Sequence, residues 1–152
     1  MPVIQIGSPA PDFTLKDQHN KEFKLSDLKG KKVLLSWHPL AFTKVCTRQM
    51  QSLEKNFKAF AKLNTIPIGM SVDTVPSKHA WAKAIKVKQL RMLSDFWPHG
   101  AVAAAYGIFR PEGFSERANV IVGEQGQVLW AKVYPIHDLP DVKEILTVLS
   151  GK

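Results

Sequence analysis

The strongest constraint on the fold is a series of short apolar runs that alternate with segments of helical periodicity. The run at 32–37 (Lys-Val-Leu-Leu-Ser-Trp) follows Gly30 and is typical of a strand buried on both faces. From 47 to 63, apolar residues recur at helical spacing between Gln, Glu and Lys, which predicts an amphipathic helix. The other expected elements of this middle and end region are a strand at 66–72, a helix at 77–87 with Trp81, Ala84 and Ile85 facing inward, a short strand at 92–93 and a closing helix at 142–149.

Two expected hairpins flank the alternating middle of the chain. One joins 13–17 to 22–25, and the other joins 119–122 to 128–133 through a turn with Gly126. Alternation of strands and helices implies parallel strands, and the terminal hairpin adds antiparallel ones. We therefore expect an α/β protein with a mixed central β-sheet flanked by helices and an N-terminal β-hairpin. The order of elements makes a thioredoxin-like fold one of several candidates, and the length of 152 residues predicts a single domain over 1–152.

Charge and hydropathy exclude several classes of function. The 21 Lys and Arg outnumber the 13 Asp and Glu, giving a net charge of +8, but no basic or acidic tail is present. The run Lys29-Gly30-Lys31-Lys32 has no interleaved aromatic residues, so nucleic acid is not an expected partner. The apolar stretch at 101–109 is far shorter than the roughly 20 residues of a membrane helix, so no membrane is expected either. No secretory signal is visible, and we expect a cytoplasmic location.

The sequence gives no indication of a metal or cofactor site. One cysteine makes a structural zinc site very unlikely and excludes an internal disulfide. The five histidines lack metal-ligand spacing, and neither a G-x-G-x-x-G motif nor a phosphate-binding loop is present. We therefore expect no cofactor and no metal.

The chemically informative segment contains the single cysteine, Cys46, between the 32–37 strand and the helix that follows it. A helix N-terminus favours an anion, and this is one of the environments that produce a reactive thiolate. Pro39 lies seven residues before Cys46, and Thr43 lies three residues before it. A strand that ends at a proline and turns over one helical turn would place Thr43 and Cys46 on the same side of a pocket. We expect an accessible thiol; the alternative is a cysteine that acts as a small buried hydrophobe.

Pro39, Thr43 and Cys46 match the P-x-x-x-T-x-x-C signature of the peroxiredoxin (AhpC/TSA) family, which are thiol peroxidases with a thioredoxin fold. The chain resembles this family over roughly 5–149. Gly-Ser-Pro-Ala-Pro-Asp-Phe at 7–13 is similar to the family's usual opening. The stretch at 93–100, which contains Phe-Trp-Pro-His-Gly, is most similar to the one-cysteine alkyl hydroperoxide reductase E-like branch.

The resemblance implies roles for four residues. Cys46 is expected to be the peroxidatic nucleophile, and Arg117 to favour its thiolate and stabilise the transition state. Thr43 would orient the peroxide through its hydroxyl, and Pro39 would shield the thiolate from water. Fixed donors aimed at developing charge lower the barrier of such a displacement. The alternative for Arg117 is a surface arginine paired with Glu112 or Glu116.

Two positions depart from the family pattern. An aromatic pair usually precedes the motif proline, whereas this chain has Trp37-His38. Strand alternation leaves both orientations of His38 open, and an inward His38 would tune the site near neutral pH. Gln49 stands where the family often has Glu, and it could still take part in an arginine network.

We therefore expect a one-cysteine peroxiredoxin that reduces hydrogen peroxide, alkyl hydroperoxides or peroxynitrite. Its sulfenic acid would be resolved by an external thiol: a thioredoxin-like protein, a glutaredoxin-like protein or a low-molecular-weight thiol. A homodimer is expected from the same resemblance. Two alternatives stay open, namely a peroxide-sensing redox-relay protein and a basic binding module in which Cys46 is incidental.

Overall fold

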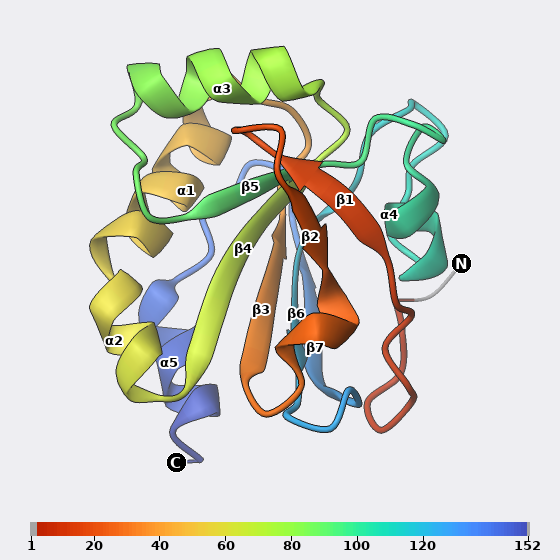
Figure 1. Ribbon diagram of the computed structural model, residues 1–152, viewed down its shortest axis with the longest axis vertical. Helices are drawn as coiled ribbons and strands as arrows, with labels where there is room; N and C mark the ends of the chain where they lie inside the picture. Colours follow the sequence, from red (N-terminus) through yellow and green to blue (C-terminus); the bar gives the residue numbers. More distant parts are fainter. Residues whose placement is uncertain (1–2, 152) are drawn as a thin grey trace.

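The computed structural model describes residues 3–151, which form one seven-stranded mixed sheet with helices on both faces (Figure 1). Its elements are β1 (Thr14–Asp17), β2 (Glu22–Lys24), a 3-10 helix η1 (Leu25–Leu28), β3 (Lys32–Trp37), α1 (Lys44–Lys55), α2 (Phe57–Lys62), β4 (Thr65–Ser71), α3 (Val75–Ala84), β5 (Arg91–Ser94), α4 (Ala101–Ala105), β6 (Arg117–Val122), β7 (Val128–Tyr134) and α5 (Val142–Leu149). The strand order is β2-β1-β5-β4-β3-β6-β7. β3, β4 and β5 are parallel, and the remaining neighbours are antiparallel.

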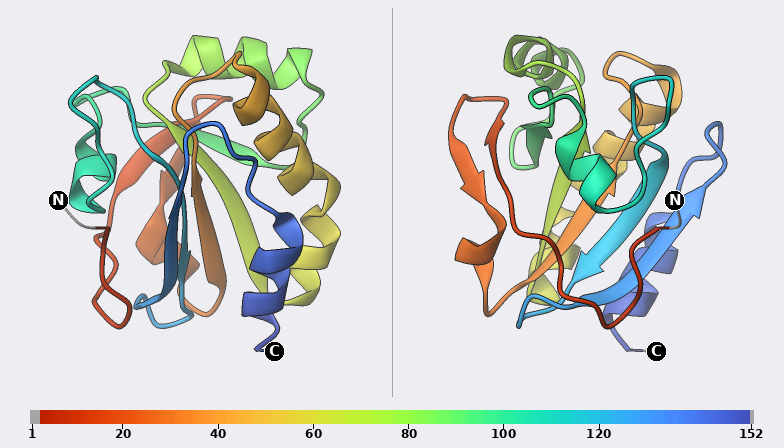
Figure 2. Two further views of the ribbon diagram at one scale, coloured as in Figure 1. Left: turned by 180° about the vertical axis from the view of Figure 1, so that it is seen from behind. Right: turned by 90° about the vertical axis from the view of Figure 1, so that its right-hand side faces the viewer.

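The central strand β3 divides the interior into two apolar cores. Because side chains alternate along a strand, Val33, Leu35 and Trp37 pack into one core and Leu34 packs into the other. Helices α1, α2, α3 and α5 contribute to the Leu34 core, and α4 contributes to the opposite one. Figure 2 shows α1, α2 and α5 on the sheet face that is turned to the viewer in its left panel. The expected α/β architecture is confirmed: a mixed sheet between helices, with the N-terminal hairpin β1–β2.

The helices differ from expectation in their boundaries. The helix expected at 47–63 begins at Lys44 and is interrupted at Asn56, which separates α1 from α2. Helix α3 begins two residues earlier than expected because the Thr74 side chain accepts a hydrogen bond from the Ser77 backbone, with a proline in the first turn. Of the residues expected to face inward, Trp81 is buried and Ile85 packs against the core, whereas Ala84 is exposed. The buried residues of α3 are Lys78, Trp81 and Ala82.

Helix α4 was not predicted as a helix. Its N-terminus is held by a side chain from the preceding turn, since the Asp95 carboxylate accepts from the backbone N–H groups of Val102 at 3.1 Å and Ala103 at 2.9 Å. Burial raises the pKa of Asp95, while these two N–H groups act in the opposite direction. A helix of five residues has little intrinsic stability, so this contact is needed to define it. No helix within residues 3–151 is long and apolar enough to cross a membrane.

Candidate active site

Cys46 lies at the start of α1, after the turn that connects β3 to this helix. The strand ends at Trp37, and the connecting turn includes Phe42, whose φ of 66° is unusual for a bulky residue. Thr43 is the N-cap residue of α1, and Cys46 is the third residue of the helix. Cys46 is therefore within the first turn, where backbone N–H groups lack intrahelical partners and the helix dipole favours an anion.

The Cys46 side chain is buried, in contrast to the accessible thiol expected from the sequence. Its exposed fraction is 0%, and it packs in the core cluster that also includes Ala41, Met50 and Trp81. The cause is tertiary: the turn before α1 folds back over the helix start, and Asp73 fixes it by accepting a hydrogen bond from the Ala41 backbone at 2.8 Å. The expectation of an exposed sulfur was wrong for this conformation.

Arg117 reaches the sulfur directly. It is the first residue of β6, and its Nη1 donates to Cys46 Sγ at 3.3 Å. Its Nε donates to the Ile136 carbonyl at 2.9 Å, and only 3% of the residue is exposed. The alternative of a surface ion pair does not hold, because Glu112 and Glu116 pair with Arg110 instead.

Gln49 completes a hydrogen-bond network around this arginine. Its Oε1 accepts from Arg117 Nη1 at 2.7 Å, one helical turn after Cys46 on α1. Its Nε2 donates to Ser36 Oγ at 2.7 Å and to the Trp37 carbonyl at 3.1 Å. A neutral amide thus orients the guanidinium and also ties α1 to β3.

The other two motif residues do not touch the sulfur through hydrogen bonds in the part of the chain that the structure describes. Pro39 is buried in the turn after β3. Thr43 is exposed, and its hydroxyl donates to the Leu40 carbonyl at 2.7 Å. This arrangement leaves the lone pairs of the Thr43 oxygen free to accept a hydrogen bond at the entrance to α1.

His38 points into the protein, on the side of α3. It is fully buried, and its Nε2 lies 3.4 Å from Lys78 Nζ. Burial lowers the pKa of His38 well below its usual range, and the positive charges of Lys78 and Arg117 act in the same direction. Lys78 was not singled out from the sequence. Its spacing of three residues before Trp81 was the available signal, because positions i and i+3 share a helix face.

The chain matches the model of the AhpC/TSA family over residues 6–131. It is 35% identical over 133 residues to alkyl hydroperoxide reductase E of Mycobacterium tuberculosis, covering 86% of each chain. A peroxiredoxin of Thermoplasma volcanium is 32% identical over 157 residues, covering 99% of this chain and 75% of the relative. The reduced 2-Cys peroxiredoxin of Plasmodium vivax superposes with a TM-score of 0.90 at 30% identity, covering 97% of this chain and 81% of the other.

The chain belongs to the peroxiredoxin family. The similarity to alkyl hydroperoxide reductase E confirms the resemblance drawn from the motifs, and the solved relative confirms the thioredoxin-like fold. This peroxiredoxin is a thiol-dependent peroxidase and hence an oxidoreductase. It has one cysteine, whereas the Plasmodium vivax relative is a 2-Cys protein.

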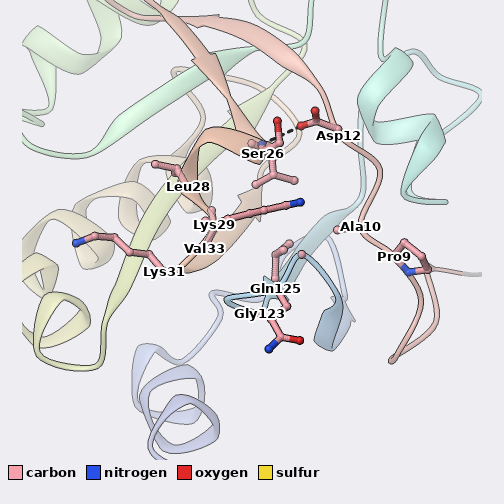
Figure 3. Close-up of a pocket in the computed structure, with 13 residues that line it drawn as sticks. Pro9, Ala10, Asp12, Ser26, Leu28, Lys29, Lys31, Val33, Gly123 and Gln125 are labelled. Carbon is pink, nitrogen blue, oxygen red and sulfur yellow. Dashed lines mark hydrogen bonds between the residues drawn. The ribbon is translucent and has the colours of Figure 1, made fainter.

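A pocket of about 320 Å³ lies at the other end of β3 in this peroxiredoxin (Figure 3). It includes Val33 at the start of the strand, whereas Cys46 follows the end of the strand. The family's opening motif contributes to it, and Asp12 there accepts from the Ser26 backbone at 2.9 Å. This motif therefore shapes the distant end of the sheet. The motif residues that line the pocket are Pro9, Ala10 and Asp12.

No group of three or more His, Cys, Asp or Glu within residues 3–151 is arranged to hold a metal ion. The Cys46 site brings together a sulfur, a guanidinium and an amide, with the Thr43 hydroxyl at the start of the same helix.

Proposed function

We propose that this peroxiredoxin works by a one-cysteine mechanism on hydrogen peroxide, alkyl hydroperoxides or peroxynitrite. The observation that supports it most directly is the 3.3 Å contact between Arg117 Nη1 and the sulfur of the only cysteine in the chain. The Cys46 thiolate attacks the nearer peroxide oxygen, a sulfur–oxygen bond forms, and the oxygen–oxygen bond breaks. The departing oxygen takes the electron pair and a proton, which yields water, an alcohol or nitrite and a sulfenic acid on Cys46.

Each neighbouring group has a role in this step. Arg117 stabilises the thiolate and then the charge that moves onto the departing oxygen, because its guanidinium is already oriented by Gln49. Thr43 orients the peroxide by accepting a hydrogen bond from it. Pro39, buried in the turn, keeps bulk water away from the sulfur. Alignment of sulfur with the oxygen–oxygen bond lowers the barrier further.

Access to the buried sulfur requires the turn at 39–43 or the first turn of α1 to move. The left-handed backbone of Phe42 makes the closed turn less favourable, since bulky residues rarely adopt φ near 66°. Phe42 is 60% exposed, so opening the turn loses mainly the contact of its ring with Trp81, whose centroid lies 6.3 Å away. Both the peroxide and the reducing thiol would enter by this route.

The cycle closes through a thiol from outside the chain. With one cysteine, an intramolecular disulfide cannot form. An external thiol condenses with the sulfenic acid, releasing water and leaving a mixed disulfide on Cys46. A second thiol then displaces the Cys46 thiolate. We propose a thioredoxin-like protein, a glutaredoxin-like protein or a low-molecular-weight thiol as the reductant.

A homodimer and a cytoplasmic location belong to the same proposal. Trp97 is 77% exposed and Phe96 45% exposed, which leaves two aromatic rings available for an interface. A supply of reducing thiols is found in the cytoplasm. Light scattering of the purified chain would measure its oligomeric state.

Oxidation of the intact protein tests the mechanism. One equivalent of peroxide should add one oxygen, which a dimedone-type reagent traps on Cys46, and excess peroxide should add two or three. Added thiol should convert the sulfenic acid to a mixed disulfide and then restore peroxide turnover. Cys46→Ser is the matched control and should show neither oxidation nor turnover. Absence of turnover with every thiol, despite rapid oxidation, would favour a redox-relay protein; rapid and productive Cys46–Cys46 dimerisation would contradict the mechanism.

A further inference from the structure

Helix α3 places a lysine in the protein interior beside the Cys46 site. Lys78, Trp81 and Ala82 occupy positions i, i+3 and i+4 and form the buried face of this helix. The Trp81 Nε1 atom donates to Thr47 Oγ1 at 3.2 Å, which fixes this face against the helical turn that contains Cys46. Lys78 has an exposed fraction of 0%. A lysine is almost never fully buried unless a charge partner accompanies it, so this position requires an explanation.

The contacts of Lys78 do not provide a conventional ion pair. Within residues 3–151 the Lys78 side chain makes no salt bridge, and its one hydrogen-bond partner is His38 Nε2 at 3.4 Å. Both nearby carboxylates are engaged elsewhere: Asp73 accepts from Ser71 Oγ at 2.6 Å, and Asp95 caps α4. Replacing such a lysine by an apolar residue of similar volume would remove a desolvation cost. Folding alone therefore gives little reason for a lysine here.

Burial and the surrounding charges define the protonation states of Lys78 and His38 near neutral pH. Burial lowers the pKa of Lys78 to about 8, although the negative charges of Asp73, Cys46 and Asp95 act in the opposite direction. Because burial keeps the pKa of His38 low, His38 is neutral and accepts a hydrogen bond from the Lys78 ammonium. The charged and titratable groups that act on the pair come from the turn after β3 (His38), α1 (Cys46), the turn before α3 (Asp73), the turn after β5 (Asp95) and β6 (Arg117).

We propose that Lys78 is a positioning residue for the Cys46 thiolate, with its buried ammonium held by neutral His38 and supplying a second positive charge in addition to Arg117. This proposal rests on the proposed role of Cys46 as the nucleophile. Coulombic attraction between buried charges is much stronger than in water, so an ammonium at this depth acts on the sulfur without touching it. No bond to Lys78 forms or breaks, and the proton stays on Nζ throughout the reaction. Loss of this proton at alkaline pH removes the second charge.

Alkylation of Cys46 by iodoacetamide across a pH range tests the proposal, because only the thiolate reacts and no peroxide is needed. Lys78→Met removes the charge at similar length, and Lys78→Gln removes the charge but can still hydrogen-bond His38. Both variants should slow the alkylation of Cys46 near pH 7 about tenfold and move the alkylation profile to higher pH. Lys83→Met, which changes an exposed lysine on the same helix, should leave the profile unchanged.

The double variant Lys78→Met with His38→Phe separates an electrostatic role from a packing role. If His38 acts by holding Lys78, the double variant should show no larger shift than Lys78→Met alone. Alkylation profiles of folded Lys78→Met and Lys78→Gln that coincide with the parent profile would overturn the proposal. Peroxide consumption is measured separately on the same proteins. A shifted profile in a protein that never consumes peroxide would support the role of Lys78 while contradicting the proposed function.

Discussion

Arg117 and Lys78 are two buried cations, one in contact with the Cys46 sulfur and the other with the neighbouring His38, and they are held in different ways. Arg117 donates to three acceptors at 2.7–3.3 Å: Gln49, the Ile136 carbonyl and Cys46 itself. Lys78 has one acceptor, a neutral ring nitrogen at 3.4 Å, and its pKa falls to about 8 because it is buried. A guanidinium stays charged at any pH where proteins are folded, whereas a buried ammonium readily loses its proton. The site thus combines a fixed charge with one that titrates.

Because the two cations are held differently, Arg117 and Lys78 should have different roles in the reaction of Cys46. Arg117 is in contact with the reacting atom and is oriented in advance, so its contribution persists into the transition state. Lys78 acts at a distance and on the resting thiolate. Removal of Arg117 should therefore have the larger effect, and removal of Lys78 should mainly change how reactivity depends on pH.

The largest expected effect is that of Arg117→Met. It should slow peroxide reduction about 10²–10³-fold, the usual cost of losing one preorganised donor to developing charge. Stopped-flow measurement of the second-order rate constant provides the test. Arg110→Met is the matched control, because Arg110 pairs with Glu112 and Glu116 near the surface, where ion pairs contribute little. A rate constant for Arg117→Met equal to that of the control would show that the contact with Cys46 is not catalytic.

Thr43→Val should slow the same step about 10²-fold, because the peroxide loses an acceptor while the volume of the side chain is kept. Thr43 is the N-cap of α1, but its side chain makes no capping hydrogen bond. The substitution removes only the exposed hydrogen bond to the Leu40 carbonyl, so it should lower the free energy of unfolding by about 1 kcal/mol or less. Thr43→Ser keeps the hydroxyl and should retain most of the activity. Retained activity in Thr43→Val together with a loss in Thr43→Ser would contradict this role, because the threonine methyl group, and not the hydroxyl, would then be the group that matters.

Gln49→Leu should have a smaller effect on rate, about tenfold, since Arg117 keeps its contacts with Cys46 and the Ile136 carbonyl. The substitution should also lower the free energy of unfolding by about 1–3 kcal/mol, because Ser36 and the Trp37 carbonyl lose a buried donor. Urea unfolding and stopped-flow kinetics measure the two effects. Gln51→Leu, at an exposed position of the same helix, is the control. It loses one exposed hydrogen bond, to the Ile85 carbonyl at 3.3 Å, so it should leave the rate unchanged and alter the free energy of unfolding by about 0.5 kcal/mol or less.

Local sequence patterns predicted those parts of the fold that depend on local interactions. The bounds of β3 and α5 agree with the expected 32–37 and 142–149, because periodicity alone defines a buried strand and an amphipathic terminal helix. Helix α4 was missed because Asp95, which binds its first backbone N–H groups, lies seven and eight residues before them and outside the N-cap position. The start of α3 was placed two residues too late, because its cap at Thr74 and the proline in its first turn precede the periodic segment.

The candidate site could likewise be predicted only where it depends on local sequence or on the family motif. The motif placed Cys46 at a helix start, and the resemblance brought in Arg117 from a strand 71 positions away. The burial of Cys46 could not be read from the motif, because it depends on how the preceding turn folds over the helix. The orientation of His38 was open for a similar reason: alternation along β3 was known, but not which face α3 would cover. Lys78 was overlooked because charged residues on a helix usually face solvent.

The smallest expected effect concerns stability and tests directly whether Lys78 titrates in the folded protein. The pKa of Lys78 is lowered from 10.5 to about 8 on folding, so between these values the unfolded chain binds more protons than the native one. Stability therefore rises with pH across this window, and the destabilisation caused by the buried charge is fully present below pH 8.

The Lys78→Met variant lacks this dependence of stability on pH. The unfolding free energy of the parent, minus that of Lys78→Met, should increase by about 1 kcal/mol between pH 7 and pH 9. Urea unfolding at the two pH values measures it, with the exposed Lys83→Met as a control whose difference should stay flat. A flat difference for Lys78→Met as well would mean that Lys78 keeps its proton across this range, and the contrast with Arg117 would then be one of geometry alone.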